Sequence, residues 1–252
     1  MKLGIISSYA PIAGQAREEL ESRYEFVVDP ASADVIVALG GDGTMLDALH
    51  YTMTKNIPVF GMNRGSVGFL LNDYSPDNLI ERITAATTTE AYPLETHVTN
   101  IYGATFEHLA INDVSITRQT GQAAKLAIRV NQEIRIEELI GDGLIVSTPV
   151  GSTAYNRSAG GPILPLEAPL HAITPICAFR PRHWKGAIVP DSFEVEVDVI
   201  DSENRRVNVS VDSAEIKDVA RVRIVKSKKK IHILCDLGRS WSEKLLSEQF
   251  YG

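Results

Sequence analysis

A short glycine-rich segment at residues 40–44 (GGDGT) limits the possible folds of this chain more than any other part of its sequence. It follows an apolar run at residues 34–39 (DVIVAL), which predicts a buried strand. It precedes an amphipathic pattern at residues 44–54, which predicts a helix. A buried strand, a tight glycine turn and a helix in this order are the beginning of a parallel α/β unit.

The flanking residues repeat this alternation of strand and helix. We expect strands at residues 2–7 and 57–62, and helices at residues 13–23 and 76–86, the last begun by Pro76. The prediction is therefore an α/β, doubly wound (Rossmann-like) N-terminal domain over residues 1–94 that carries the 40–44 loop. The threonine cluster at residues 87–89 with Pro93 is the best linker candidate.

The remaining sequence, residues 95–252, has a different pattern. Short runs rich in β-branched residues are bounded by Gly, Asn, Asp or Ser, which predicts a β-rich, β-sandwich-like C-terminal domain. A helix is expected at residues 240–250, and the segment from about 237 to 252 can pack back on the first domain. The expected strands are at residues 96–104, 106–118, 124–133, 141–148, 192–200, 205–213, 220–226 and 230–236.

Composition excludes several classes of protein. A formal net charge of -7 over 252 residues provides no positive field to attract a polyanion, so nucleic acid is not an expected partner. The N-terminal residues lack a signal-peptide pattern and no apolar run is long enough for a membrane span, so we expect a cytoplasmic protein without a membrane partner.

The cysteines and one lysine-rich run have simple structural interpretations. Cys177 and Cys235 stand beside aliphatic residues without a metal-binding spacing, which predicts small buried thiols. The lysines of residues 226–230 lie between two apolar runs, where a solvated hairpin turn is expected.

The 40–44 loop has the composition of an anion site. Gly41 and Gly43 let a phosphate approach bare backbone, and the helix beginning near Thr44 offers unpaired N–H groups. A carboxylate beside phosphates is repelled unless it binds a cation or a hydroxyl, so Asp42 needs a role. Asp42 can steady Mg²⁺ on donor phosphates, or remove the proton of an attacking hydroxyl. The structural alternative is a plain Asp-Gly turn.

A second loop follows the strand expected at residues 141–148. Residues 149–162 (PVGSTAYNRSAGGP) again combine glycines with small polar residues before a helix start. Ser152 and Thr153 can act as helix caps, but capping alone does not require Gly151, Tyr155 and Ser158 nearby. A second nucleotide-binding loop is the sharper hypothesis.

Together these segments resemble the NAD kinase family, whose hallmarks are a GGDGT loop and a glycine- and threonine-rich segment ending in GSTAY, here residues 151–155. The resemblance covers nearly the whole chain. It implies that NAD accepts a phosphoryl group on the adenosine ribose 2′-hydroxyl to give NADP. It also implies ATP, or polyphosphate in some members, as donor, with Mg²⁺. Asp42 is then the expected catalytic base.

The same resemblance assigns roles to other residues. Phe69, in the run 63–70 (NRGSVGFL), is expected to line the adenine pocket. Asn112 and Asp113 would hold the adenosine ribose, although the family usually has Glu in place of Asp113. Asp212 matches a family aspartate that glycine normally follows, whereas Ser213 stands here.

Further implied contacts belong to the second loop. Thr153, Ala154, Tyr155 and Ser158 would line the dinucleotide cleft, and Asp142 would reach the nicotinamide amide. Members of the family assemble as dimers or tetramers in which the last contact can cross a subunit boundary, so a homo-oligomer is expected. Residues 178–188 depart from the family pattern, and we expect a surface loop there with a half-buried Trp184.

Two other functions fit parts of the pattern. A lipid or sphingoid-base kinase shares the GGDGT loop, but it leaves the 151–155 segment unexplained. A module that senses NAD or NADP without turnover would differ at Asp42 or Asp212, and both carboxylates are present. The sequence does not choose between ATP and polyphosphate or between NAD and NADH, and it does not assign the metal ligands, product feedback or dimer versus tetramer.

Overall fold

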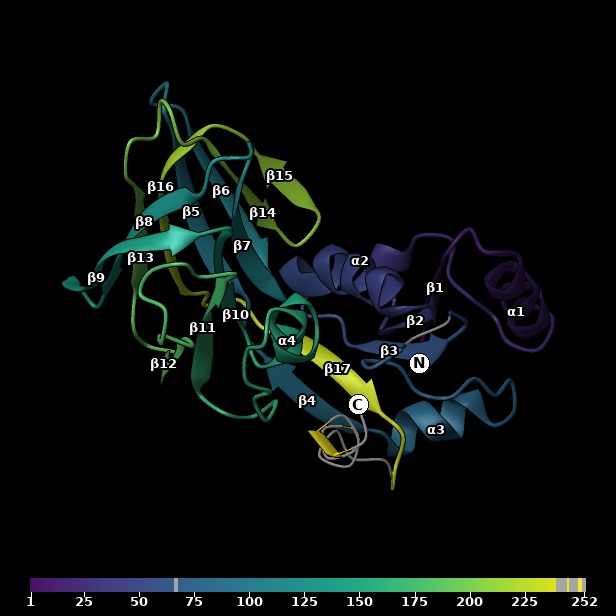
Figure 1. The fold of residues 1–252 in the computed structure, drawn as a ribbon. Coiled ribbons are helices and arrows are strands. Elements are labelled where there is room, and N and C mark those ends of the chain that lie inside the picture. The colour runs from purple at the N-terminus through teal and green to yellow at the C-terminus, as the bar shows by residue number, and fades with distance from the viewer. Residues whose placement is uncertain (66–67, 239–243, 245–248, 251–252) are drawn as a thin grey trace. The chain divides into compact units, whose positions relative to one another are not determined.

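The computed structural model describes residues 1–65, 68–238, 244 and 249–250 of the chain. The chain forms two compact units (Figure 1). The first unit combines Met1–Ala91 with the C-terminal part of the chain from Lys229 onward, and the second unit is Tyr92–Lys228.

The first unit is built on a sheet with strand order β1-β2-β3-β17-β4. Strands β1, β2, β3 and β17 run parallel to one another, and β4 is antiparallel to β17. The strands are β1 (Leu3–Ser7), β2 (Val35–Gly40), β3 (Val59–Asn63), β4 (Thr87–Ala91) and β17 (Ile231–Cys235). The helical segments are α1 (Pro11–Glu21), η1 (Pro30–Ser32), α2 (Asp42–Thr52), η2 (Met53–Lys55) and α3 (Leu79–Ala85).

Helices cover both faces of this sheet, as a doubly wound fold requires. Residues of α1 and α3 form one buried cluster with alternate residues of β1, β2 and β3, among them Val37 and Phe60. Helix α2 packs on the opposite face, where a side chain at Gly61 would lie 2.8 Å from the sulfur of Met45. Because both faces are covered, β2 is buried along its whole length, as its continuous apolar run predicts.

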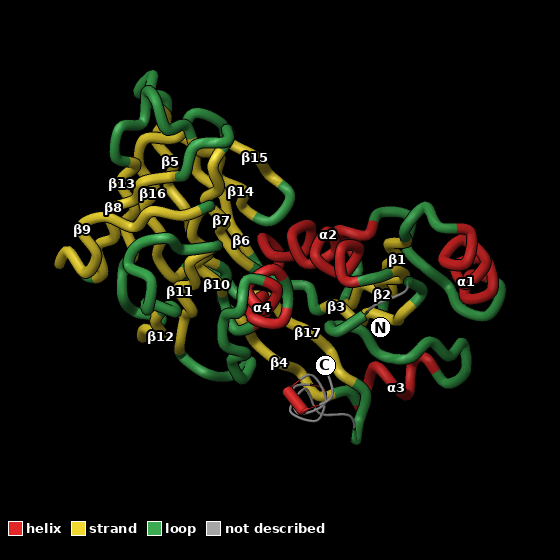
Figure 2. The backbone as a smooth tube through the Cα atoms, viewed as in Figure 1, coloured by secondary structure: helices red, strands yellow, loops and turns green. Residues whose placement is uncertain are grey.

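The second unit consists of two antiparallel sheets, and Figure 2 shows strands and loops through most of it. One sheet has the order β6-β5-β16-β13-β8-β9 and the other β12-β11-β10-β7-β14-β15. The strands of the first are β5 (Leu94–Asn100), β6 (Thr105–Ala110), β8 (Ala124–Val130), β9 (Glu133–Gly141), β13 (Val195–Val199) and β16 (Val219–Lys226). Those of the second are β7 (Asp113–Arg118), β10 (Gly143–Ser147), β11 (Leu170–Ile176), β12 (Ala187–Pro190), β14 (Val207–Val211) and β15 (Ala214–Ile216), and two short helices, η3 (Val150–Thr153) and α4 (Tyr155–Ser158), follow β10.

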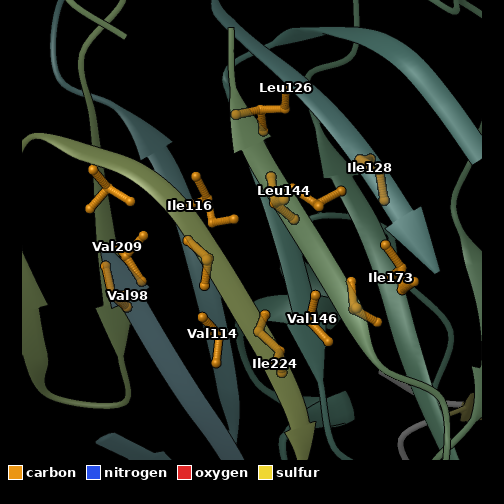
Figure 3. Packing of buried hydrophobic residues seen from close by; sticks show 14 of the residues in the cluster. Val98, Val114, Ile116, Leu126, Ile128, Leu144, Val146, Ile173, Val209 and Ile224 are labelled. Carbon is orange, nitrogen blue, oxygen red and sulfur yellow. The ribbon is translucent and has the colours of Figure 1, made fainter. Parts of the chain in front are cut away.

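One apolar core holds the two sheets together (Figure 3). Alternate residues of β8 and β13 are buried, so each strand turns one face inward. Leu126 and Ile224 come from one sheet, and Ile116, Leu144 and Val209 from the other. The predicted fold class, a doubly wound α/β part followed by a β-sandwich, is confirmed.

The C-terminal strand differs from its prediction. Residues 230–236 were expected in the β-rich domain, but β17 lies between β3 and β4 in the first unit's sheet. The expected linker at residues 87–89 is strand β4, which pairs with β17. Threonine is β-branched and suits a pleated strand, and Thr89 is buried while its neighbours are exposed. The linker prediction used only local composition, whereas pairing with the distant strand β17 makes these residues a strand.

The lysine-rich segment is not a hairpin turn, because β16 and β17 belong to different sheets. Lys226 pairs with Asp191 and lies over the ring of Tyr92, 4.2 Å from its centroid. Lys230 pairs with Glu90 at 2.7 Å. These ends of the run therefore have specific partners.

Other local predictions shift or fail. Helix α2 begins at Asp42 rather than Thr44, and α3 begins at Leu79 because Asn78 adopts a left-handed conformation (φ 54°). The strand expected over residues 106–118 is broken between β6 and β7. Cys235 is buried as expected, but Cys177 is exposed, which makes the prediction of a buried thiol wrong there.

The helix predicted at residues 240–250 falls mainly outside the described residues. None of the helices in the described part of the chain is both long and apolar enough to cross a membrane.

A buried amide ties β17 to its neighbours and provides a test of the sheet. The Asn72 side chain donates to the carbonyls of Gly61 (3.1 Å) and Leu234 (3.0 Å) and accepts from the N–H of Asp236 (2.9 Å). Asn72→Leu keeps the volume but removes these bonds, so we expect a loss of about 2 to 4 kcal/mol of unfolding free energy in urea.

Asn204→Leu is the matched control, because this exposed amide bonds only to Asp201 across a turn. It should change the unfolding free energy by less than about 0.5 kcal/mol. Equal stability of the Asn72→Leu and wild-type proteins would contradict the role given to Asn72.

Candidate functional site

The predicted site residues fall into two groups, one in each unit. Gly41, Asp42, Gly43, Thr44 and Phe69 belong to the first unit. The second group comprises Asn112, Asp113, Asp142, Thr153, Ala154, Tyr155, Ser158 and Asp212.

The first group lies where the parallel strands of the first unit end. The register pairs Leu39 of β2 with Ser7 of β1 and Gly40 with Asn63 of β3, so the chain leaves all three strands at one edge. This carboxyl edge is where open α/β sheets bind ligands. Gly41 is the N-cap of α2 in an extended conformation (φ -100°), and Asp42, Gly43 and Thr44 form the first turn. Helix N–H groups without intrahelical partners therefore lie in the GGDGT segment.

Asp42 joins this helix to the loop that follows β3. Its carboxylate accepts hydrogen bonds from the N–H of Phe69 (2.9 Å) and of Leu70 (2.8 Å), one on each oxygen. A carboxylate offers about four acceptor positions, so each oxygen keeps capacity for one more donor. Asp42 thus orders the Phe69 segment and still has oxygen lone pairs to offer a hydroxyl.

Close packing explains two of the glycines. A Cβ at Gly40 would lie 2.2 Å from the hydroxyl oxygen of Thr44. A Cβ at Gly65 would lie 3.0 Å from the Cα of Gly41. A side chain at Gly40 would therefore displace Thr44, and one at Gly65 would push the loop after β3 away from the GGDGT segment.

In the second unit, Asp212 plays a similar part. It lies in the turn between β14 and β15 in a left-handed conformation (φ 48°), which aspartate tolerates better than most residues. Its carboxylate accepts from the N–H groups of Ile111 (2.7 Å), Asn112 (3.0 Å) and Asp113 (3.4 Å). These bonds stabilise the break between β6 and β7, so the Asn-Asp pair lies at the end of a strand rather than in the middle of one.

The environment of Asp113 is unusual for a carboxyl group. The residue is 9% exposed. Burial raises the pKa of Asp113 to about 7, and the negative charge of Asp212 adds to the effect. The carboxyl group of Asp113 therefore gains a proton near neutral pH, where it can donate a hydrogen bond as well as accept one.

Asn112 has a side-chain oxygen without a partner. Its Oδ1 is buried and accepts no hydrogen bond within the described residues. Its backbone oxygen accepts from the N–H of Thr148 at 2.9 Å, and a Cβ at Gly151 would lie 2.2 Å from the same atom. The glycine of the GSTAY segment is thus required for contact with the Asn-Asp pair.

Buried polar side chains shape the rest of that segment. Asn156 is fully buried, donates to the carbonyls of Ser152 (3.2 Å) and Pro162 (2.9 Å), and accepts from the hydroxyl of Thr174 (2.6 Å). Ser152 accepts from the N–H of Leu164 at 3.0 Å. These contacts hold η3 and α4 in place, with Thr153, Ala154, Tyr155 and Ser158 on them or between them.

Tyr155 connects this segment electrostatically to other predicted residues. Partial burial raises the pKa of Tyr155, and the charges of Asp113, Cys177 and Asp142 act in the same direction. Asp142 itself accepts a hydrogen bond from Arg118 Nε at 2.6 Å and is 40% exposed. The second unit therefore places the Asn-Asp pair, Asp142 and Tyr155 in one neighbourhood.

Several residues of this architecture were not predicted. Thr148, Asn156 and Arg118 carry contacts that position predicted residues, and Cys177 lies near Tyr155. A buried asparagine inside a glycine-rich turn was the available signal for Asn156, because its amide must find partners when buried. Nothing in the local sequence links Arg118 to Asp142.

The loop over residues 178–188 contributes to a different feature of the second unit. Trp184 is partly buried and packs against the sandwich core, as expected. It lines an apolar cavity of about 570 Å³ with Ile128, Ile173, Val189 and Phe193. None of the predicted site residues lines this cavity.

A preformed metal site is absent from the described residues. No group of three or more His, Cys, Asp or Glu side chains in this part of the chain could hold a metal ion. Mg²⁺ commonly binds through substrate phosphates, water and only one or two carboxylates, and Asp42 supplies one carboxylate at the first turn of α2.

A carboxylate at a helix N-terminus on the carboxyl edge of a parallel sheet, together with buried polar groups on a β-sandwich, fits a phosphotransferase that acts on a nucleotide. The chain matches the ATP-NAD kinase N-terminal domain over residues 14–91 and the ATP-NAD kinase C-terminal domain over residues 111–235. The chain belongs to the NAD kinase family and is an enzyme of that class.

Curated relatives agree over nearly the full length. The chain is 51% identical over 249 residues to the NAD kinase of Rhizobium meliloti (strain 1021), covering 98% of this chain and 96% of the relative. It is 46% identical over 250 residues to the NAD kinase of Caulobacter vibrioides, covering 99% and 96%. The predicted family is confirmed, and neither the lipid-kinase nor the sensing-module alternative is supported.

Solved structures share the fold. Yeast NADH kinase complexed with NADH superposes with a TM-score of 0.85 at 20% identity, covering 100% of this chain and 88% of that one. An NAD kinase from Archaeoglobus fulgidus in complex with ATP gives a TM-score of 0.78 at 25% identity, covering 98% and 99%.

The raised pKa of Asp113 predicts a pH-dependent stability. The unfolded carboxyl group ionises near its ordinary value of 3.8, whereas the folded group keeps its proton until about pH 7. Asp113 therefore does not lower the unfolding free energy at low pH. It lowers the unfolding free energy progressively as the pH rises to 7. Asp113→Asn should gain about 2 to 3 kcal/mol more unfolding free energy at pH 8 than at pH 5, relative to wild type.

Urea unfolding of both proteins at the two pH values measures this difference. Glu167→Gln, at an exposed position of the same unit, should show no such pH-dependent gain. A constant difference between Asp113→Asn and wild type across this range would show that the carboxyl group is not destabilised by burial.

Proposed function

We propose that this enzyme transfers the terminal phosphoryl group of ATP to the adenosine ribose 2′-hydroxyl of NAD and so forms NADP. Support comes from the family, from the GGDGT segment at a strand edge, and from a carboxylate placed at that edge. The observation that carries the proposal is the position of Asp42, at the first turn of α2 with both oxygens fixed by loop amides.

Asp42 is the proposed general base. Its two hydrogen bonds fix the carboxylate in one orientation while leaving an acceptor position on each oxygen. A hydroxyl that donates to this carboxylate loses its proton to Asp42 as its oxygen attacks the phosphorus. The fixed orientation means that little reorganisation is needed when the proton moves.

The first turn of α2 supports the developing negative charge. The N–H groups of Gly43 and Thr44 belong to the orphan donors of a helix N-terminus, which favours anions. Gly41, without a side chain, lets phosphate oxygens approach these donors. Mg²⁺ bound with the donor would supply further charge neutralisation. Positioning by these groups accounts for much of the expected acceleration.

The proposed acceptor contacts use Phe69 of the first group and residues of the second group. Asn112 has a buried, unpaired oxygen that can accept from a ribose hydroxyl, and Asp113 lies next to it. Phe69 is proposed to line the adenine pocket, Asp142 to reach the nicotinamide amide, and Asp212 to support the pair as described. Thr153, Ala154, Tyr155 and Ser158 would line the dinucleotide cleft.

A cytoplasmic location and a homo-oligomer, dimer or tetramer, belong to the same proposal and rest on the family resemblance and the sequence pattern. Polyphosphate remains the competing donor. The direct test is to incubate the purified enzyme with NAD, Mg²⁺ and either ATP or polyphosphate and to measure NADP. Lack of NADP with both donors would overturn the proposed function.

Asp42→Asn tests the base. The amide cannot take a proton from the hydroxyl, so we expect kcat to fall by about 100-fold or more, while NAD binding measured by calorimetry is kept. The asparagine oxygen can still accept only one of the two loop N–H bonds, so Tm must be measured alongside.

Asp47→Asn is the matched control, because Asp47 is an exposed carboxylate on the same helix. It should leave kcat within about twofold of wild type, as exposed substitutions usually do. Normal turnover by a folded Asp42→Asn enzyme would remove Asp42 from the role of base.

A further inference from the structure

Arg64 stands at the ligand-binding edge of the first unit and is not explained by the contacts described so far. It directly follows β3, whose last residue, Asn63, pairs with Gly40 of β2. The N–H of Arg64 donates to the carbonyl of Gly40 at 2.8 Å. The backbone of Arg64 is therefore fixed beside the GGDGT segment.

The side chain of Arg64 is also held in place. Its guanidinium carbon lies 3.4 Å from the centroid of the Tyr74 ring, which is a close stacking contact. Tyr74 in turn donates its hydroxyl to Glu19 at 2.7 Å, and Glu19 is bound through its other oxygen by Arg23 at 2.9 Å. The ring that supports Arg64 is thus anchored to helix α1.

The pKa of Tyr74 reflects its contacts with Glu19 and Arg64. Burial raises the pKa of Tyr74 above its ordinary value, and the hydrogen bond to Glu19 raises it further. The adjacent Arg64 acts in the opposite direction, first as a hydrogen-bond donor to Tyr74 and then through its positive charge. Because Glu19 already has Arg23 and Tyr74 as partners, it does not neutralise Arg64 through a direct ion pair.

One donor of the Arg64 guanidinium is left without an acceptor in the described part of the chain. Its Nε is buried and has no hydrogen-bond partner within the described residues. No carboxylate in that part of the chain forms an ion pair with Arg64, whereas Arg82 of α3 binds Asp236 and the carbonyls of Ser75 and Asp73. A buried donor without an acceptor is costly, and guanidinium groups match phosphate oxygens well.

We propose that Arg64 binds phosphate oxygens of a reactant held at the GGDGT edge, with Tyr74 as the residue that positions it. The inference deepens the proposed function and rests on it for the identity of the reactants. The phosphate has two possible sources, the triphosphate of the donor and the pyrophosphate of NAD. Stacking on Tyr74 leaves the edge of the guanidinium plane available for paired N–H···O bonds.

Binding experiments test the contact without requiring turnover. Calorimetry with inorganic tripolyphosphate and with NAD should be carried out on wild type, Arg64→Met and Arg64→Lys. Removing the charge should weaken binding of at least one of these ligands by about 10- to 100-fold, the range for hydrogen bonds to charged groups. Lysine keeps the charge but not the planar fork, so its loss should be smaller.

Arg17→Met is the matched control. Arg17 is an exposed arginine of α1 in the same unit and pairs only with Glu21 at 2.8 Å. It should bind tripolyphosphate and NAD as wild type does. Wild-type affinity of a folded Arg64→Met protein for both ligands would overturn the proposal.

The two sources are separated by kinetics. A rise in KM for ATP alone, paired with weaker tripolyphosphate binding, assigns Arg64 to the donor, and a rise for NAD alone assigns it to the acceptor pyrophosphate. If the wild-type enzyme forms no NADP, the proposed function fails, but weaker tripolyphosphate binding by Arg64→Met would still uphold the phosphate contact.

Tyr74 has a separate test. Tyr74→Leu removes the ring and should weaken binding of the same ligand as Arg64→Met, while Tyr74→Phe restores a stacking surface and should recover most of the lost affinity. A merely structural effect would lower Tm in both variants without this recovery. Unchanged ligand affinity in Tyr74→Leu would refute the positioning role.

Discussion

In both units, an aspartate carboxylate that accepts main-chain N–H groups holds a loop in place. Asp42 binds the amides of Phe69 and Leu70, and Asp212 binds the amides of Ile111, Asn112 and Asp113. Hydrogen bonds to a charged group are stronger than neutral ones, so a single side chain can fix a segment that has no strand pairing of its own. Each loop held in this way carries predicted site residues. The two carboxylates therefore link the architecture of each unit to its chemistry.

The scaffolds beneath these loops differ, and so do their contributions. In the parallel sheet of the first unit, β1, β2 and β3 end at one edge. Backbone N–H groups, Asp42 and Arg64 lie at this edge because they directly follow these strands in the sequence. The antiparallel sandwich of the second unit instead brings together distant turns, so that Asp212 reaches a strand break about a hundred residues away in the chain. The first arrangement is the one proposed to bind phosphates, and the second supplies the buried polar groups proposed to contact the acceptor nucleotide.

Local pattern was a good guide to some elements and a poor one to others. The fully apolar run of β2 agrees with its burial on both faces, and the alternating runs of β8 and β13 agree with burial on one face. Successive side chains of a strand point to opposite faces, so the apolar pattern indicates which faces are buried. The threonines of β4 were interpreted as a linker, since no local feature reveals that β17 will pair with them. The same reason explains the misplacement of β17 and of the lysines before it. The exposed Cys177 shows that an aliphatic neighbourhood in the sequence does not guarantee burial.

The sequence alone determined the α/β and β-rich division, the two glycine-rich segments and, through them, the family and the enzyme class. Glycine turns and apolar periodicity are local properties, so they can be recognised before the chain is folded. Only the tertiary structure decided that Asp42 and Asp212 hold loops, that burial beside Asp212 raises the pKa of Asp113, and that Arg64 is stacked on Tyr74 with a buried donor unmet. These properties depend on burial and on partners far away in the chain, and neither is set until the chain has folded.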